Sequence, residues 1–189
     1  MDFDKVIEKR RSVHNFKDKK INWKHVLEAI YAGSQTPLAG NISNMKFIIV
    51  EDEDIIQKIA KYTDQLWINQ AQTVIIVCSE EKHLERMYGE RGRIYCRQQA
   101  GAAIENVLLK LTDLGLSTCW VGAYNDNEVR FLLKIPKDIN IEAIIPIGHE
   151  KGKISKKRKR DVENLIYWEN WNKKRRSSLI KDENIKEEY

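Results

Sequence analysis

The chain has 189 residues, of which 42% are hydrophobic, and a formal net charge of +5. This length predicts a single domain with a real core, and the apolar content excludes a disordered chain. The sequence holds neither an apolar run near the ~20 residues that span a bilayer nor the apolar core of a signal peptide, so we expect a cytoplasmic protein.

Two helices are predicted at the start of the chain. Asp2 or Asp4 can cap the first, whose apolar residues repeat at helical spacing and which we expect to end near Arg10. Asn22 caps the second, and Gly33 is predicted to end it.

Residues 34–44 show no hydrophobic periodicity and are rich in Gly, Pro, Ser and Asn. This composition predicts a loop whose backbone can approach a ligand closely. Strands are then predicted at 47–50 and 73–78, with a helix between them. The second strand is apolar throughout, so we expect it to be central. The charged residues 80–93 predict an exposed helix and loop.

The longest predicted element is a helix over residues 94–114, ended by Gly115. Its small residues at 101–103 let another backbone pack closely, so we expect it to be buried, and a subunit interface is one place for it. A short strand at 118–121, a further helix and a core strand at 141–147 follow. Four strands alternating with helices predict an α+β protein with three layers, α/β/α.

The cysteines and histidines form no metal-binding pattern. Cys78, Cys96 and Cys119 are widely spaced, which suits thiols in a reducing compartment, and the four histidines are isolated from one another. We therefore expect no metal site.

Two basic stretches are candidates for binding anions. Arg10, Arg11, Ser12 and His14 are a compact set of donors that suits a phosphate, although an Arg-Arg pair alone is more often a solvated helix end. Residues 151–160 hold seven cations and no carboxylate, and this block could bind nucleic acid or simply keep a loop in water.

Several motifs occur in an order typical of one family. They are Arg10–Phe16, Thr36–Asn41, Gly115–Gly122, Ala143–Gly148 and Tyr167–Trp171. Together they resemble the nitroreductase family over roughly residues 3–171. The resemblance implies a central mixed or antiparallel sheet flanked by helices, with an FMN-binding domain at 1–171 and a polar tail at 172–189. It also implies a homodimer with FMN sites between the subunits.

The resemblance places FMN contacts on matching positions of this sequence. For the phosphate and ribityl chain these are Arg10, Arg11, Ser12 and His14, with Arg158 and Arg160 from the late basic block, where Lys156 and Lys157 stay alternatives. For the ring, from the other subunit, they are Pro37, Leu38, Ala39, Asn41 and Ser43. The main chain of Val121 and Gly122 matches positions near flavin N5.

The implied activity is that of an FMN-dependent oxidoreductase, which uses NADH or NADPH to reduce nitroaromatics, quinones or related acceptors by ping-pong hydride transfer. Since the flavin carries the hydride, no catalytic side chain is expected. One alternative is another flavin chemistry on the same fold, reductive dehalogenation or flavin modification. Another is a nucleic-acid-binding module that uses residues 151–160.

Two departures from the family pattern bear on the site. His14 stands where the family often has Arg, and Ile42–Met45 replaces a frequent Leu-Gln-Pro-Trp. The second departure concerns substrate preference more than the cofactor.

Overall fold

The structure is a computed structural model that describes residues 1–152 and 162–174. The chain divides into two units, Met1–Lys153 and Ile154–Tyr189, which are described separately. In the first unit the elements are α1 (Phe3–Lys9), β1 (Phe16–Lys17), α2 (Trp23–Ser34), η1 (Ala39–Asn41), β2 (Met45–Val50), α3 (Glu53–Tyr62), η2 (Leu66–Gln70), β3 (Thr73–Glu80), α4 (Lys82–Tyr88), α5 (Glu90–Asp113), β4 (Ser117–Thr118), α6 (Asp126–Leu133) and β5 (Ile139–Glu150).

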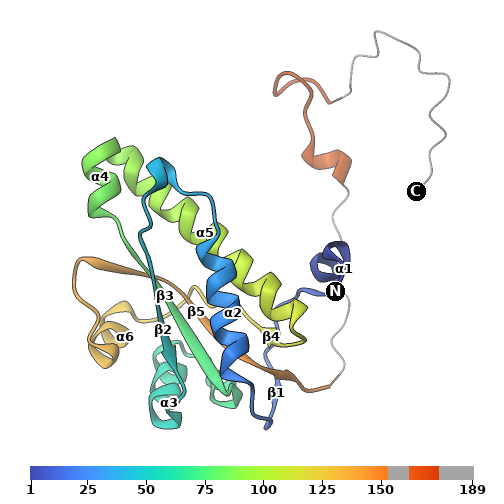
Figure 1. Cartoon of the computed structure of the whole chain (residues 1–189), viewed down its shortest axis with the longest axis vertical. Coiled ribbons are helices and arrows are strands. Elements are labelled where there is room, and N and C mark those ends of the chain that lie inside the picture. Colours follow the sequence, from blue (N-terminus) through green and yellow to red (C-terminus); the bar gives the residue numbers. More distant parts are fainter. Residues whose placement is uncertain (153–161, 175–189) are drawn as a thin grey trace, which may run out of the picture. The chain divides into compact units, whose positions relative to one another are not determined.

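The described strands form one antiparallel sheet, in the order β1-β5-β3-β2, with β4 also paired to β5 (Figure 1). β3 lies between β2 and β5, so the predicted central place of this apolar strand is confirmed. The predicted α+β class, with a sheet flanked by helices, is confirmed as well.

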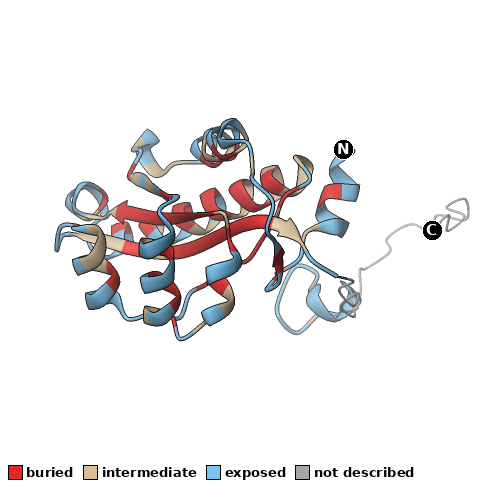
Figure 2. Ribbon diagram, turned by 90° about the horizontal axis from the view of Figure 1, so that it is seen from below, coloured by how far each residue is buried: buried red, intermediate tan, exposed pale blue. Residues whose placement is uncertain are grey.

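The core lies on both faces of this sheet. On one face Ile75 and Val77 of β3 pack with α2 and α5, for example with Ala29 and Ile104. The intervening β3 residues, Val74 and Ile76, are also fully buried, and helices lie on both sides of the sheet in Figure 2. Because both faces of β3 are covered, its residues need not alternate between apolar and polar, which explains the unbroken apolar sequence.

Gly33 does not end α2, contrary to the prediction. The helix continues through Ser34, and Gly33 is buried against α5. A Cβ at this position would lie 2.7 Å from Cγ2 of Val107 and 3.2 Å from the carbonyl oxygen of Ala103. The glycine is therefore present because α2 and α5 pack closely.

Other element bounds also differ from the predictions. α5 begins at Glu90, because Gly89 has a φ of 59° and separates it from α4, so only part of 80–93 is a loop. β4 covers only Ser117–Thr118, and Val121 instead forms a bridge with Ile144. β1 was not predicted, since two residues carry no periodic signal.

In the second unit the described residues include η3 (Val162–Leu165). The rings of Tyr167 and Trp171 stack with centroids 4.3 Å apart. Arg158, Arg160 and most of the predicted tail at 172–189 lie outside the described residues. Among the helices that are described, none combines the length and the apolar character that crossing a membrane requires.

Candidate functional site

The segment after α1 runs in an extended conformation beside β4. Arg10 leaves the helix with φ −57° and ψ 126°. The N–H of Val13 donates to the carbonyl oxygen of Thr118 at 3.0 Å, and Ser12 forms a parallel bridge with the same residue. The donor-rich stretch of the sequence is therefore held against the chain that follows α5.

Extended backbone sends successive side chains to opposite sides. Val13 is only 1% exposed, so its side of the segment faces the interior. Arg11 shares the parity of Val13, and its guanidinium donates to both carboxylate oxygens of Glu150, at 2.9 and 2.8 Å. Arg10, Ser12 and His14 share the other parity; Arg10 and Ser12 are half-buried, and His14 is exposed.

Arg10 and His14 of this segment each lie close to another side chain. Nε of Arg10 lies 3.1 Å from a carboxylate oxygen of Glu105, in an ion pair between partly exposed side chains. Nε2 of His14 lies 3.2 Å from Sγ of Cys119, and its ring centroid is 4.5 Å from that of Trp67. A phosphate at Arg10 would compete with Glu105 for its guanidinium, whereas Arg11 is held by Glu150.

The sequence did not reveal the part that η2 plays here. Besides the contact of Trp67 with His14, Oε1 of Gln70 accepts from the N–H of Phe16 at 3.1 Å. A tryptophan and a glutamine in a short 3-10 helix give no periodic signal, so neither was singled out.

Val121 and Gly122 follow Cys119 closely and bring open main chain to the same region. The main chains of Val121 and Ile144 exchange two hydrogen bonds of 3.0 Å, so this turn is tied to β5. Gly122 is exposed, and among the described residues no atom lies within 4 Å of the place where its Cβ would be. A planar group could therefore approach this backbone.

The predicted ring-facing loop has an unusual backbone. Gly40 and Asn41 have φ values of 58° and 56°, in the left-handed region. Pro37, Asn41 and Ser43 are exposed, whereas Leu38 and Ala39 are half-buried. Asparagine tolerates this conformation better than most residues, which fits its place in the turn.

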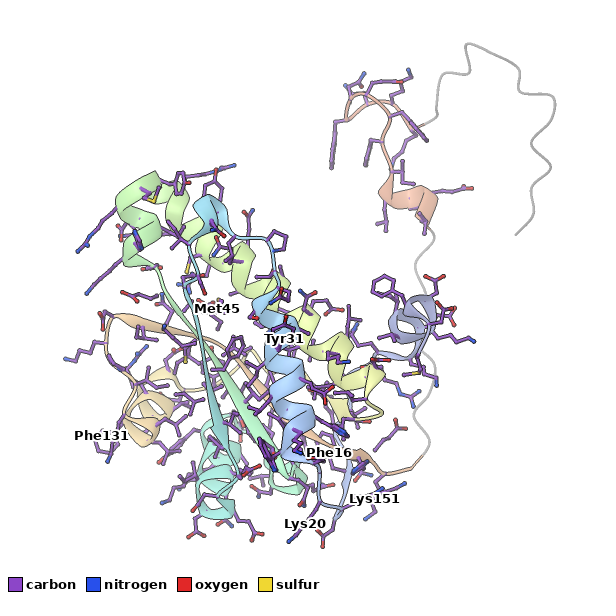
Figure 3. All side chains as sticks on the ribbon, in the orientation of Figure 1. Phe16, Lys20, Tyr31, Met45, Phe131 and Lys151 are labelled. Carbon is purple, nitrogen blue, oxygen red and sulfur yellow. The ribbon has the colours of Figure 1, made fainter. Side chains whose placement is uncertain are left out.

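Within one chain α2 separates the loop from the Arg10–His14 segment in the sequence. The segment precedes the N-terminal end of α2 and the loop follows its C-terminal end; the helix has 12 residues. A helix of that length spans about 18 Å. Figure 3 shows Phe16, just beyond the segment, near the lower end of α2, and Met45, just beyond the loop, to the left of α2 at mid-height. One chain thus holds Ser12 and His14 against Thr118 and Cys119, just before Val121–Gly122, while Pro37–Ser43 follows the C-terminal end of α2.

His149 on β5 lies beside this region, opposite Lys17 in the β1–β5 register. Desolvation lowers its pKa below the usual value, and the nearby charge of Lys19 lowers it further. On β3, burial raises the pKa of the Cys78 thiol to about 11, which makes it a poor nucleophile.

The sequence of this chain matches a known protein family. The nitroreductase family model matches residues 7–69 and 60–149 of this chain. The chain belongs to the nitroreductase family. This is a family of oxidoreductases, so the family predicted from the motifs is confirmed.

Individual relatives agree with this membership. A protein of Archaeoglobus fulgidus named "Putative NADH dehydrogenase/NAD(P)H nitroreductase" is 30% identical over 152 residues, 78% of this chain and 84% of that protein. The FMN reductase [NAD(P)H] of Bacillus subtilis is 26% identical over 168 residues, 81% of this chain and 68% of that protein. The crystal structure of a nitroreductase family protein from Clostridium novyi NT has a TM-score of 0.75 and 26% identity, covering 92% of this chain and 96% of that one.

Proposed function

We propose that this nitroreductase-family chain is an FMN-dependent oxidoreductase that uses NADH or NADPH to reduce nitroaromatics, quinones or related acceptors. The observation that carries the proposal is the bridge that pairs the Arg10–His14 segment, at Ser12, with Thr118, four residues before the open backbone at Gly122. The relative named for FMN reduction with NAD(P)H supports the choice of cofactor and reductant.

The residues present fit an FMN. Its phosphate requires cations and donors, which Arg10 and Ser12 supply, and its flat ring requires an apolar surface with no side chain in the way. Gly122 supplies the absence of a side chain, and no described atom other than its chain neighbours lies within 4 Å of the place where a Cβ would be. Bound FMN would supply the hydride-accepting and hydride-donating chemistry.

The chain's own residues would bind and orient the cofactor. Arg10 would neutralise the phosphate once it exchanges Glu105 for that group, and Arg11 would hold the segment on β5 through Glu150. The bridge from Val121 to Ile144 would keep the main chain at Gly122 in place beside N5 of the flavin. Arg158 and Arg160 stay predicted phosphate contacts from the late basic block.

We further propose a homodimer in which the Pro37–Ser43 loop of one subunit completes the FMN site of the other, as the family resemblance implies. A groove of about 870 Å³ lies between α1, α2 and α5. Its lining includes Phe3 and Tyr31, which are 66% and 68% exposed. Exposed aromatic side chains of this size are typical of a surface that a partner covers.

A second copy in this groove would complete the site. The groove is lined by α1, which leads directly to Arg10, and by Gln35, where the loop begins. Two-fold apposition of this face would therefore place the loop of one subunit toward the Arg10–His14 segment of the other. A cytoplasmic location stays a prediction from the sequence.

The reaction can be tested with the FMN-reconstituted protein. Anaerobic mixing with NADH or NADPH should bleach the flavin absorbance, and a quinone or nitroaromatic should restore it. If donor and acceptor share one site, initial rates at several acceptor concentrations give parallel double-reciprocal lines. Bound flavin that neither nicotinamide reduces would refute the proposed reductant and favour another flavin chemistry.

A further inference from the structure

Behind the ring-facing loop lies a buried chain of polar side chains that the proposed chemistry does not use. Gln99 on α5 and Asn44, just before β2, are only 4% and 3% exposed. Oε1 of Gln99 accepts from the N–H of Ala39 at 2.8 Å, and its Nε2 donates to Oδ1 of Asn44 at 2.7 Å. The same Nε2 lies 3.3 Å from the carbonyl oxygen of Ile42. One side chain thus contacts the loop at three places.

The chain of hydrogen bonds continues across the sheet. Nδ2 of Asn44 donates to Sγ of Cys96 at 2.9 Å, and this thiol donates to Oγ of Ser79 at 3.2 Å. Ser79 in turn donates to the carboxylate of Glu142, which is paired with Arg97. All donors therefore point the same way, toward a carboxylate that can only accept.

This direction fixes the orientation of both amides. If the Gln99 amide turned over, its NH₂ would face the N–H of Ala39 and its oxygen would face Oδ1 of Asn44, so both bonds would be lost. Buried polar groups without partners are costly, and the arrangement is therefore held in one state. The main-chain oxygen of Asn44 also accepts from the N–H of Glu80 at 2.9 Å, which ties this residue to the end of β3.

The loop needs such support from outside its own backbone. Gly40 and Asn41 both adopt left-handed φ values, and residues other than glycine reach that region only at a cost. On the other side of the turn the hydroxyl of Tyr88 lies 2.6 Å from the place where a Cβ on Gly40 would be. The turn is therefore held between α4 and the amide of Gln99.

We propose that Gln99 is a positioning residue that sets the place of the Ala39–Asn41 turn and, with it, the loop surface that packs against the partner's flavin. The second part rests on the proposed function. The first part concerns the chain alone and is testable without any cofactor.

The test replaces Gln99 with methionine, which keeps the length of the side chain but makes none of these hydrogen bonds. In the cofactor-free protein, hydrogen exchange of the amides at 39–44 should accelerate about tenfold, while β3 and β5 keep their protection. In the reconstituted protein the Kd for FMN should rise about tenfold, and the visible circular dichroism of the bound flavin should change. Gln98→Met is the matched control, because Gln98 is the exposed neighbour on the same helix.

A second variant removes the hydrogen bond between Ala39 and Gln99 by a change in the loop. Ala39→Pro removes the N–H that Gln99 accepts, and the extended Leu38, with φ −123° and ψ 130°, is compatible with a following proline. It should reproduce the faster exchange at 40–44 even where Gln99→Met folds poorly. Unchanged exchange of this segment in the folded variants would overturn the proposal. If wild-type protein fails to bind FMN, the proposed function is wrong. Faster exchange in the variants would still support the positioning role of Gln99.

Discussion

The main chains of Val121 and Ile144 exchange two hydrogen bonds of 3.0 Å, and the next residue, Gly122, faces open space. A Cβ at position 122 would therefore meet no described atom within 4 Å apart from its chain neighbours, and a longer side chain would extend into the volume proposed for the flavin ring. Gly122→Leu should leave the melting temperature within about 2 °C of wild type, as is usual for surface changes, and should abolish FMN binding. Gly122→Ala should give an intermediate loss. Unchanged flavin affinity in the leucine variant would remove Gly122 from the ring site.

Arg10 is the cation that we expect to matter most for the phosphate. Arg10→Gln should weaken FMN binding about tenfold to hundredfold, since a hydrogen bond to a charged group contributes about 1.5–3 kcal/mol. Flavin fluorescence during titration measures the affinity. Glu105→Gln is the matched control, because it removes the carboxylate 3.1 Å from Nε of Arg10 without touching the cation. That variant should bind FMN as tightly as wild type or more tightly; weaker binding would argue against competition between Glu105 and the phosphate.

The exposed face formed by α1, α2 and α5 should hold the dimer together. Tyr31→Glu places a charge on a groove residue that is 68% exposed, so the isolated chain should still fold. Sedimentation should show a monomer, and the monomer should lose FMN, because the partner's loop is missing. Phe131→Glu is the control, since Phe131 on α6 is 85% exposed and does not line the groove. A Tyr31→Glu protein that stays dimeric with full flavin would move the interface elsewhere.

The close packing of α2 on α5 predicts a large effect of one methyl group. Gly33→Ala would place a Cβ 2.7 Å from Val107 and 3.2 Å from a main-chain oxygen of Ala103, and overpacking of this kind costs about 1–3 kcal/mol. Urea unfolding measures the loss. Adding Val107→Ala should recover part of it, because the closest atom is then removed. Strictly additive losses in the double variant would show that Val107 is not the obstacle.

His149 should make stability depend on pH. Its folded-state pKa is lowered, so the unfolded chain binds a proton that the folded chain does not as the pH falls below the ordinary value of 6.5. Stability from this residue is thus present at higher pH and lost on acidification. Between pH 7.5 and 5.5, His149→Gln should reduce the loss of unfolding free energy in urea titrations. Asp113 and Asp138 also have lowered pKa values, but the stability that they contribute is lost only at pH values more acidic than this range. An equal loss in both proteins would contradict this assignment.

Local signals in the sequence were sufficient for the cap of α2 and for the central strand. Asn22 accepts from the N–H of Lys24 at the start of α2, because a cap depends only on residues a few positions away. The cap predicted for α1 is not seen, since Asp2 stands at that position but its side chain makes no capping hydrogen bond. The unbroken apolar run of β3 identified a strand covered on both faces.

Features that depend on distant partners could not be predicted in this way. Glycine is typical of a helix end, but Gly33 is required because α2 packs closely against α5 at this position. Gln99 interrupts an apolar helix face, and only the folded chain shows its contacts with Ala39 and Asn44. The two-residue strand β1 exists because β5 lies beside it. The site contacts of Arg158 and Arg160 stay predictions from the family resemblance.

The central claim is that the chain binds FMN at a site completed by a second subunit, and a visible absorption titration with FMN tests it most directly. The purified dimer should show a shifted, structured flavin spectrum and saturate at one FMN per chain, and Gly122→Leu should give the spectrum of unbound FMN. A wild-type spectrum that stays that of unbound FMN at every protein concentration would contradict the account.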